Sequence, residues 1–596
     1  MREWVTVPRR EGHHLTRMAV LSLLLVLGVT TWQATVGFGK SARLGETARF
    51  GLLLFQIITY VQLTLLLFFS ALSAAGTVAQ EKDRRTFVLL LITDMRDYEI
   101  VLGKMLGSLL PIMLFLLGTV PVLALMLLLG GISLEQLIQA ILILFATAIG
   151  AGSLGGLVAL WREKTFQALA LAVLFLVLYI CVVQGVSIIA ASFGIDGAQF
   201  QAWLDPFQAL ATVMAPPDHP ILMAPAYIYT IVMIGWSVVL NGLGVYKLRD
   251  WNPAGEPIIQ RDAPSEEELE AIDRAKAHAA PGAVREVWAN PILFREIATL
   301  AYGRRPLLVK LAFGVVLSLI LYFAVSELHR PNGRPSFAAA YGIVPVAILS
   351  LLLISAQAVT SITSERDGRC LDLLLVTDLS PREFVFGKMG GVIWNTKEFI
   401  LPPLLLACYY AAEGALTRTP RNMDSLSALA LNFVPLLCVI GAILVMFAFV
   451  MTLGIHVALR VESSRLAIAN TLGTVFFLSV GTLISIYLIV INGGSFANQW
   501  LSFLAFIFLG IGGLWWVLSA DRPASALTLA SWLCPFAMFY CVTNILVAKP
   551  GSAESADPLV PFLVIAGAFG FTIRAMLVPL LSEFDVSLGR TTVNEE

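Results

Sequence analysis

Long apolar runs follow one another along almost the whole chain, separated by short polar segments. The earliest cover 15–36, 50–79 and 105–129. An α-helix rises about 1.5 Å per residue, so about 20 apolar residues cross the roughly 30 Å of hydrocarbon in a bilayer. We expect spans at 15–36, 50–79, 105–129, 134–160, 166–193 and 224–246 in the first half, and at 307–325, 337–363, 399–412, 428–459, 466–491, 500–518 and 559–581 in the second. The pattern predicts an all-α, polytopic membrane helical bundle.

The composition favours the same class. Hydrophobic residues make up 58% of the 596 residues, charged residues make up 13%, and the mean hydropathy is +0.83. Soluble domains are closer to half apolar and a quarter charged, so this chain is built for lipid rather than water. The net charge of −1 argues against a nucleic-acid partner. The six cysteines include no CxxC pair, which is typical of packing residues rather than a disulfide framework.

Lys and Arg gather in particular loops and predict the orientation of the spans. The loops 80–104 and 364–388 are rich in both, whereas 194–220 and 491–499 contain neither. Basic residues of short loops stay on the cytoplasmic side. We therefore expect the charged loops and both ends of the first half in the cytoplasm, and the chain in the inner membrane, in contact with its lipids. The basic loop 37–49 is an exception to this rule.

A polar segment rich in Pro and Glu separates the two halves. Ser265 followed by Glu268 is a capping-box signature and predicts a short solvated helix at 265–279. That helix is either a docking surface or part of a plain linker, and charge runs are usually just solvated. We divide the chain into a first half at 1–250, a linker at 251–289 and a second half at 290–596.

Two segments, 81–105 and 365–389, match without gaps over about half of their positions. The identical residues are Glu81, Asp83, Arg85, Leu89, Leu90, Leu91, Thr93, Asp94, Glu99, Val101, Gly103, Lys104 and Met105, which recur as Glu365, Asp367, Arg369, Leu373, Leu374, Leu375, Thr377, Asp378, Glu383, Val385, Gly387, Lys388 and Met389. Such self-similarity indicates a duplicated unit. Because the first half has an even number of spans, the halves are predicted to be parallel, related by an axis along the membrane normal.

Each repeat joins a charged start to an apolar centre. An ionised side chain costs about 2.5–3.5 kcal/mol at the centre of a membrane helix, so the charged start stays out of the lipid. The Leu-rich centre must then pack on headgroups, on the bundle or on a partner. Lys104 and Lys388 mark the entry of the third span of each half, where we expect them to act as interface anchors.

The order of a Glu, a basic and an acidic residue, then Leu-Leu, Thr, Glu and Gly-Lys resembles the cytoplasmic segment of type-2 ABC exporter permeases. The amphipathic helix opened by Asn290-Pro291 is similar as well. The resemblance implies a transmembrane subunit that is not an enzyme, uses no cofactor and works with separate cytoplasmic ABC ATPase subunits. The residues that it implies as ATPase contacts are Glu81, Arg85, Glu365 and Arg369. The family usually has Gly at the positions of Arg85 and Arg369.

Other chemistry has little support in the sequence. Gly39-Lys40-Ser41 ends like a phosphate-binding loop, but Ala34 stands where the first Gly is required. No HExxH motif is present, and His456 stands alone in an apolar run, so we expect no metal site. Lys397-Glu398 precedes Pro402, which is a possible start of the third span. This pair is either an intramembrane functional pair or an interfacial one.

The shared Trp-Leu-x-Pro-Phe marker shows where the halves differ. It occurs at 203–207 and at 532–536, about thirty residues later in the second half relative to the preceding connection. We interpret 500–518 as an insertion that forms an extra helix pair with 528–547. The C-terminus then stays cytoplasmic.

Two other functions remain as alternatives to the permease. A membrane-embedded lipid-modifying enzyme would need polar residues clustered at one depth, but the loops offer only Asp205, Asp218 and His219. A non-transporting membrane scaffold would need no such cluster. We favour a permease that alternates its access under the control of separate ATPase subunits.

Overall fold

The computed structural model describes most of the chain from residue 44 onward. The described residues are 44–192, 197–214, 224–252, 288–298, 306–328, 335–368, 370–375, 379–414, 432–481, 500–519, 524–547 and 558–582, with a few isolated positions such as Trp32. The predicted first span, the linker helix at 265–279 and the loop 491–499 therefore lie outside the described residues.

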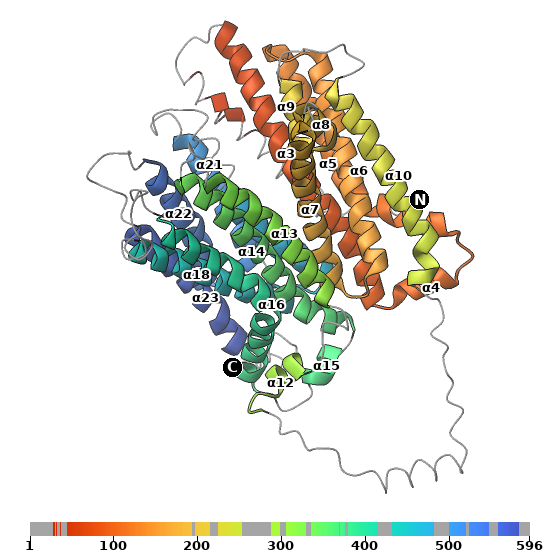
Figure 1. Cartoon of the computed structure of the whole chain (residues 1–596). Helices are drawn as coiled ribbons and strands as arrows, with labels where there is room; N and C mark the ends of the chain where they lie inside the picture. Colours follow the sequence, from red (N-terminus) through yellow and green to blue (C-terminus); the bar gives the residue numbers. More distant parts are fainter. Residues whose placement is uncertain are drawn as a thin grey trace.

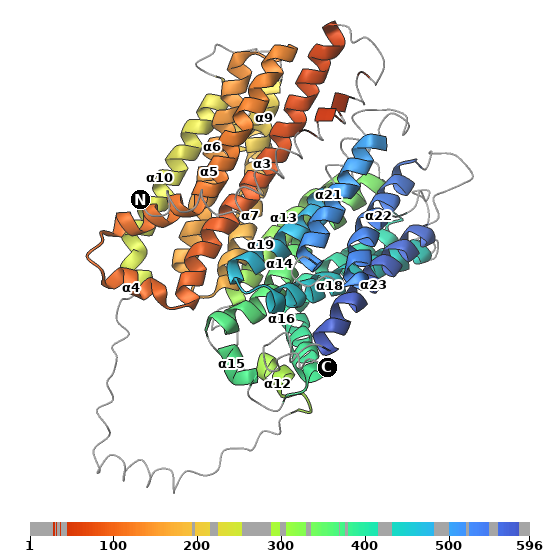
Figure 2. The ribbon, with the colours of Figure 1, turned by 180° about the vertical axis from the view of Figure 1, so that it is seen from behind.

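Every regular element in this described part is a helix, which confirms the all-α bundle. Nine of the helices there are long and apolar enough to cross a bilayer. The chain is a multi-pass membrane protein. The helices fall into two groups, residues 44–252 and residues 288–582, that stand side by side in both views (Figures 1 and 2).

The first group contains five long helices. They are α3 (Leu44–Asp83), α5 (Asp97–Leu129), α6 (Leu134–Trp161), α7 (Thr165–Ser192) and α10 (Pro225–Trp251), with the short helices α4 (Thr86–Ile92), α8 (Gly197–Leu204) and α9 (Pro206–Met214) between them. The long helices match the predicted spans, although α5 starts before 105. The predicted connection 194–220 contains two short helices, α8 and α9, that the apolar pattern did not predict. The α9 side chains Ala209, Leu210 and Val213 are buried within the first half.

The second group repeats this order and adds helices. Its elements are α12 (Pro291–Ala298), α13 (Pro306–Leu328), α14 (Pro335–Asp367), α15 (Cys370–Leu375), α16 (Pro381–Ala412), α18 (Phe433–Arg460), α19 (Ser464–Phe476), the π-helix η3 (Phe477–Gly481), α21 (Trp500–Ser519), α22 (Ser525–Val547) and α23 (Leu559–Ser582). A span starting near 399 was wrong, because α16 begins at Pro381 and continues through Pro402 and Pro403. Helix α19 and η3 cover the first part of the predicted span 466–491.

The two helices of the expected extra pair, α21 and α22, are present and antiparallel, and their crossing of the membrane remains a prediction. Arg460 at the end of α18 donates to the Leu518 carbonyl oxygen (3.1 Å), so α21 ends beside the end of α18. Cys541 in α22 instead lies 3.3 Å from the Pro561 carbonyl oxygen at the start of α23. Helix α23 therefore returns toward the end of the bundle at which α18 ends. The cytoplasmic location of the C-terminus remains a prediction.

Close helix packing relies on glycine at a few positions. A Cβ added at Gly155 of α6 would lie 2.1 Å from the Ala71 carbonyl oxygen of α3, so only Gly allows this approach. Gly152 and Gly510 are similarly crowded, by Leu109 and by Pro535. By contrast, a Cβ added at Gly156, Gly512 or Gly513 would meet nothing within 4 Å in the described part of the chain, so close packing depends on only some of the glycines in these helices.

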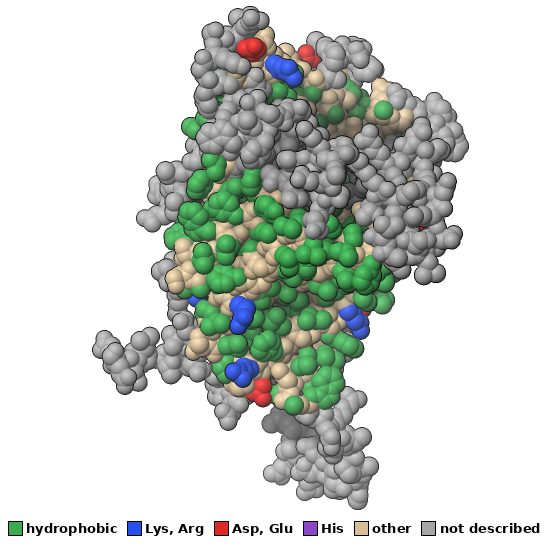
Figure 3. Space-filling view, turned by 90° about the vertical axis from the view of Figure 1, so that its left-hand side faces the viewer, with side chains coloured by type: hydrophobic (Ala, Val, Ile, Leu, Met, Phe, Trp, Pro, Cys, Tyr) green, Lys and Arg blue, Asp and Glu red, His purple; other side chains and the backbone are tan. Residues whose placement is uncertain are grey.

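The halves meet along α3 and α7 on one side and α13, α14 and α19 on the other. Phe68 of α3 stacks on Phe476 of α19 with ring centroids 4.5 Å apart, and Phe69 meets the same ring edge-on. Apolar side chains dominate the face drawn in Figure 3, with few charged side chains among them, as expected for a surface in contact with lipid.

Candidate functional site

The two repeats lie at one end of the bundle, where α3 and α14 end and where α5 and α16 begin. We call this the charged end. In the first half, Lys104 Nζ of α5 lies 2.6 Å from Glu81 Oε1 of α3. In the second half, Lys388 Nζ of α16 lies 2.8 Å from Glu365 Oε1 of α14. The structure therefore joins the predicted contact residues Glu81 and Glu365 to the predicted anchors of the same repeat.

The next position of each repeat holds a cation that binds the end of another helix. Lys82 donates to the carbonyl oxygens of Leu160 (2.5 Å) and Arg162 (3.1 Å) at the end of α6. Arg366 donates in the same way to those of Ala458 (2.9 Å) and Val461 (2.6 Å) at the end of α18. The last carbonyl groups of a helix have no partner within it and carry partial negative charge, so a cation there stabilises the end.

The third position holds an aspartate, and here the halves touch. Asp83 accepts a hydrogen bond from Thr165 Oγ1 at the start of α7 (2.6 Å). Asp367 instead accepts from Arg84 of the first half, through Nε (3.2 Å) and Nη2 (3.1 Å). The counterpart of Arg84 in the second repeat is Gly368, which has no side chain, so the reciprocal bridge to Asp83 cannot form. Arg84–Asp367 is thus the one ion pair between the halves among the described residues.

Helix α12 adds two more charges to the second-half pair. Glu296 Oε1 lies 2.7 Å from Lys388 Nζ and 3.1 Å from Arg295 Nη2, and Arg295 also pairs with Glu365. Lys388 and Glu296 are only 1% and 2% exposed. Burial opposes ionisation of the Glu296 carboxyl, but Lys388 and Arg295 outweigh it and lower its pKa.

Arg85 lies where the chain turns from α3 into α4. Its φ is 58°, and it is the one described non-Gly residue with a positive φ. Helix α4 buries Phe87 and Leu91, with Lys82 Nζ 5.7 Å from the Phe87 ring centroid. Arg85 itself is exposed, as are Val88, Leu89 and Ile92. The corresponding Arg369 lies outside the described residues.

The recurrent glutamate at Glu99 and Glu383 caps a helix. Glu99 Oε2 accepts the Arg96 backbone N–H (2.9 Å) at the start of α5, and Glu383 Oε2 accepts the Ser380 N–H (3.0 Å) at the start of α16. These caps extend both helices beyond the predicted apolar spans. Hydrogen bonding to Ser380 also lowers the pKa of Glu383.

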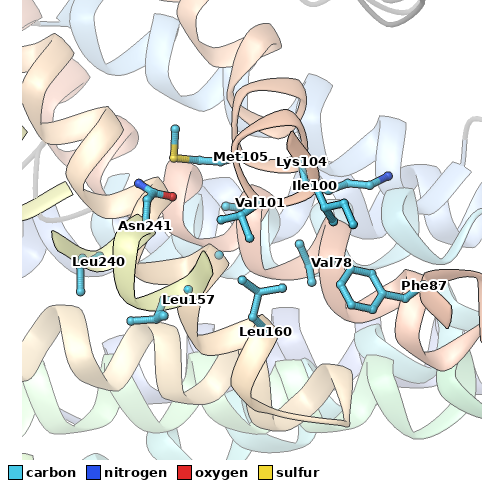
Figure 4. A pocket seen from close by; sticks show the side chains of 13 residues that line it. Val78, Phe87, Ile100, Val101, Lys104, Met105, Leu157, Leu160, Leu240 and Asn241 are labelled. Carbon is cyan, nitrogen blue, oxygen red and sulfur yellow. The ribbon is translucent and has the colours of Figure 1, made fainter. Parts of the chain in front are cut away.

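A small cavity of about 10 Å³ is lined in part by residues of the first-half repeat (Figure 4). Val78, Phe87, Val101, Leu160 and Asn241 are among its lining residues, from α3, α4, α5, α6 and α10. Lys104 is on its rim, with its side chain directed away from the apolar residues in the view. This volume holds about one water molecule and no larger ligand.

The remaining charged candidates lie apart from the repeats. Glu398 pairs with Lys310 of α13 (2.6 Å), and Lys397 Nζ lies 3.7 Å from the Trp394 ring centroid. Both therefore sit within a continuous helix rather than before its start. Buried His456 lies against the backbone of Leu518 and Met576, at the packed ends of α21 and α23. No group of His, Cys, Asp or Glu suited to hold a metal occurs in the described ranges.

Sequence reasoning singled out the duplicated Glu and Lys residues but missed Lys82, Arg84 and Arg366 as site residues. The recurrence of a cation before each Asp was the available signal for Lys82 and Arg366. Arg84 has no counterpart, so the repeat carried no signal for it. Comparison with known proteins adds nothing to this geometry, because no family model and no curated protein matches the chain.

Proposed function

We propose that the chain is the two-half permease of an ABC-type exporter in the inner membrane, driven by separate cytoplasmic ATPase subunits. The resemblance of both repeats to type-2 ABC exporter permeases supports the family. The observation that carries the proposal is the Arg84–Asp367 ion pair, which joins the two repeats at the charged end. A partner that binds both repeats can therefore change how the halves meet.

In this proposal a movement of α4 is transmitted to the membrane helices through the chain and through hydrogen bonds. Only Arg84 and Arg85 separate α4 from α3. Lys82 ties the end of α3 to the end of α6, so a displacement of α4 moves α3 and α6 together. Arg366 links α14 to α18 in the same manner. In this proposal each half moves as a unit, and the contacts between the halves change.

The four implied ATPase contacts take two roles in this proposal. Arg85 binds the ATPase directly, because it is exposed beside the apolar face of α4 formed by Leu89 and Ile92; Arg369 has the same role by position. Glu81 and Glu365 act indirectly, because their side chains are 23% and 17% exposed and hold Lys104 and Lys388.

The enzyme alternative has no specific observation in its favour. Asp205, the most promising acid for a lipid-modifying site, is 5% exposed. Its Oδ1 accepts the Phe207 backbone N–H (2.9 Å), so it serves as a cap at the start of α9.

Site-specific photocrosslinking tests the proposal. A benzophenone amino acid replaces Arg85 or Leu89 in cells that make the chain, and adducts are identified by mass spectrometry. We expect an adduct with a protein that has a nucleotide-binding P-loop. Leu134 is the matched control, since it is 61% exposed at the opposite end, where the chain turns from α5 into α6. Adducts that contain no ATPase, or the same adducts from Leu134, overturn the proposal.

The purified chain without a partner provides a second test. We expect neither specific ATP binding nor ATP hydrolysis, because the chain has no phosphate-binding loop of the required spacing. Hydrolysis should appear only when the crosslinked ATPase is added. Hydrolysis that copurifies with the chain through every step, with no ATPase present, contradicts the assignment.

A further inference from the structure

Helix α16 carries charge at positions where its counterpart in the first half is apolar. Helices α5 and α16 begin at the same position of the repeat. Continued along them without a gap, the alignment places Trp394, Lys397 and Glu398 opposite Leu110, Met113 and Leu114. Ionised side chains within membrane helices are costly and usually have a function. This charge is therefore a feature of the second half alone and not a consequence of the duplication.

The two charged residues of α16 lie beside a lysine of α13. Lys310 Nζ lies 2.6 Å from Glu398 Oε1, and both side chains are 35% exposed. Lys397 Nζ lies 3.7 Å from the centroid of the exposed Trp394 ring. We call Lys310, Trp394, Lys397 and Glu398 the α13–α16 cluster. It contains two cations and one carboxylate, so one positive charge is left without a negative partner within the cluster.

The α13–α16 cluster adjoins an apolar surface. On α16, Leu401 and Leu405 lie one and two turns beyond Lys397, and they are 52% and 64% exposed. On α13, Leu311 follows Lys310 directly and is 59% exposed. Exposed leucines on a membrane helix contact the acyl chains of lipids rather than water. The cluster and these leucines together match the two parts of a phospholipid, a polar headgroup and apolar chains.

The cluster also lies where α16 passes from the charged end into its apolar part. Helix α12 packs on α16 as far as Gly391, where an added Cβ would lie 2.6 Å from Glu296 Cβ. Trp394 and Lys397 occupy the next two turns, and residues 399–412 contain no charged side chain. Trp is enriched at the boundary between lipid and water, and Lys extends its ammonium group toward the headgroups there. This position places the cluster at the level of lipid phosphates.

We propose that the α13–α16 cluster binds one anionic phospholipid from the leaflet at the charged end. Lys397 contacts the lipid phosphate, and Lys310, held by Glu398, adds a second positive charge to the site. The Trp394 ring lies against the glycerol region, and the acyl chains run along Leu401. Because the cluster has a surplus positive charge, an anionic headgroup binds more tightly than a zwitterionic one. This inference does not depend on the exporter assignment.

Lipid titration of the purified full chain tests the proposal. Native mass spectrometry measures the Kd of phosphatidylglycerol and of phosphatidylcholine with the same acyl chains. We expect phosphatidylglycerol to bind roughly fivefold more tightly. Lys397→Met, which introduces the residue type found in α5, should weaken phosphatidylglycerol binding roughly fivefold, and Lys310→Ala should do the same. Lys397→Arg should retain the binding. Lys397 forms no ion pair among the described residues, so its variants should fold normally.

Lys247→Met is the matched control. Lys247 lies 5.0 Å from the Tyr246 ring centroid, but it pairs with Asp250 (2.8 Å), which neutralises its charge. This variant should bind phosphatidylglycerol as the unchanged chain does. Equal binding of the two lipids overturns the proposal, as does an equal loss in Lys247→Met and Lys397→Met. Displacement of the lipid by glycerol phosphate overturns it as well, because the site then recognises a free phosphate rather than a phospholipid.

Discussion

Lys104 and Lys388 hold the same position in two copies of one repeat, yet their surroundings differ. Lys104 is 22% exposed and pairs with one carboxylate, Glu81, among the described residues. Lys388 is 1% exposed and has two, Glu365 and Glu296. The repeat itself supplies only the inner pair of each half. Helix α12 supplies Arg295 and Glu296, which join the second-half pair. A duplicated sequence therefore produces a partly exposed ion pair in one half and a buried network in the other.

This difference indicates which helices at the charged end can move most easily. A buried charge network fixes its helices, because any opening leaves charges without partners in a poorly polar environment. A partly exposed pair can open and be solvated at little cost. The second half is therefore the more rigid side of the charged end, and α3, α4 and α5 of the first half form the more adaptable side.

The largest expected effect comes from removing the lysine of each half. Lys388→Ala removes the ammonium group that pairs with buried Glu296 and with Glu365, which should cost about 3–5 kcal/mol of stability. Lys104→Ala should cost about 1 kcal/mol, because Glu81 can be solvated. Melting temperatures of the purified variants, measured by size-exclusion chromatography after heating, should fall much further for Lys388→Ala. Equal losses would mean that the two sites are enclosed alike.

Glycine substitutions should also change the stability of the protein differently in the two halves, by a smaller amount than the lysine substitutions. Gly387→Ala forces a Cβ to within 3 Å of α12 and should cost about 1–3 kcal/mol through overpacking. Gly103→Ala should instead stabilise the chain by about 1 kcal/mol, because a Cβ there meets nothing within 4 Å among the described residues and Ala favours a helix interior more than Gly does. The same heating assay compares them. A stabilising Gly387→Ala would show that α12 does not pack as closely as the structure indicates.

How far the sequence predicted these differences depends on the distance between the interacting residues. Apolar runs predicted the long helices because burial in lipid is a local requirement of each segment. The early starts of α5 and α16 were missed, although Ser380 and Glu383 form a capping box that is readable in the sequence. The Arg84–Asp367 pair joins residues 283 positions apart, and no local pattern encodes that contact. The enclosure of Lys388 was likewise unpredictable, because it depends on how α12 packs.

The cross-half ion pair should contribute modestly to stability and more to coupling. Arg84 is 50% exposed, so its pair with Asp367 should be worth less than about 1 kcal/mol. Arg84→Ala and Asp367→Asn should each weaken it, and the double variant should show non-additive melting temperatures. If the pair transmits partner binding, ATP hydrolysis by the reconstituted complex should fall in Arg84→Ala although the fold is intact. Additive effects and unchanged hydrolysis would remove this contact from the proposed mechanism.

The smallest expected effect concerns the backbone at Arg85. A φ of 58° places this residue in the left-handed region, where a Cβ costs about 1 kcal/mol and Gly costs nothing. Arg85→Gly should therefore raise the melting temperature slightly, whereas Arg85→Ala, which keeps the Cβ, should not. Both variants should lose photocrosslinking partners at Leu89 if the guanidinium binds the ATPase. A gain in stability together with weaker ATPase binding would show that the chain tolerates backbone strain at this turn to keep a cation there. Unchanged ATPase binding in both variants would instead exclude Arg85 as a contact and leave the apolar face of α4 to bind the partner.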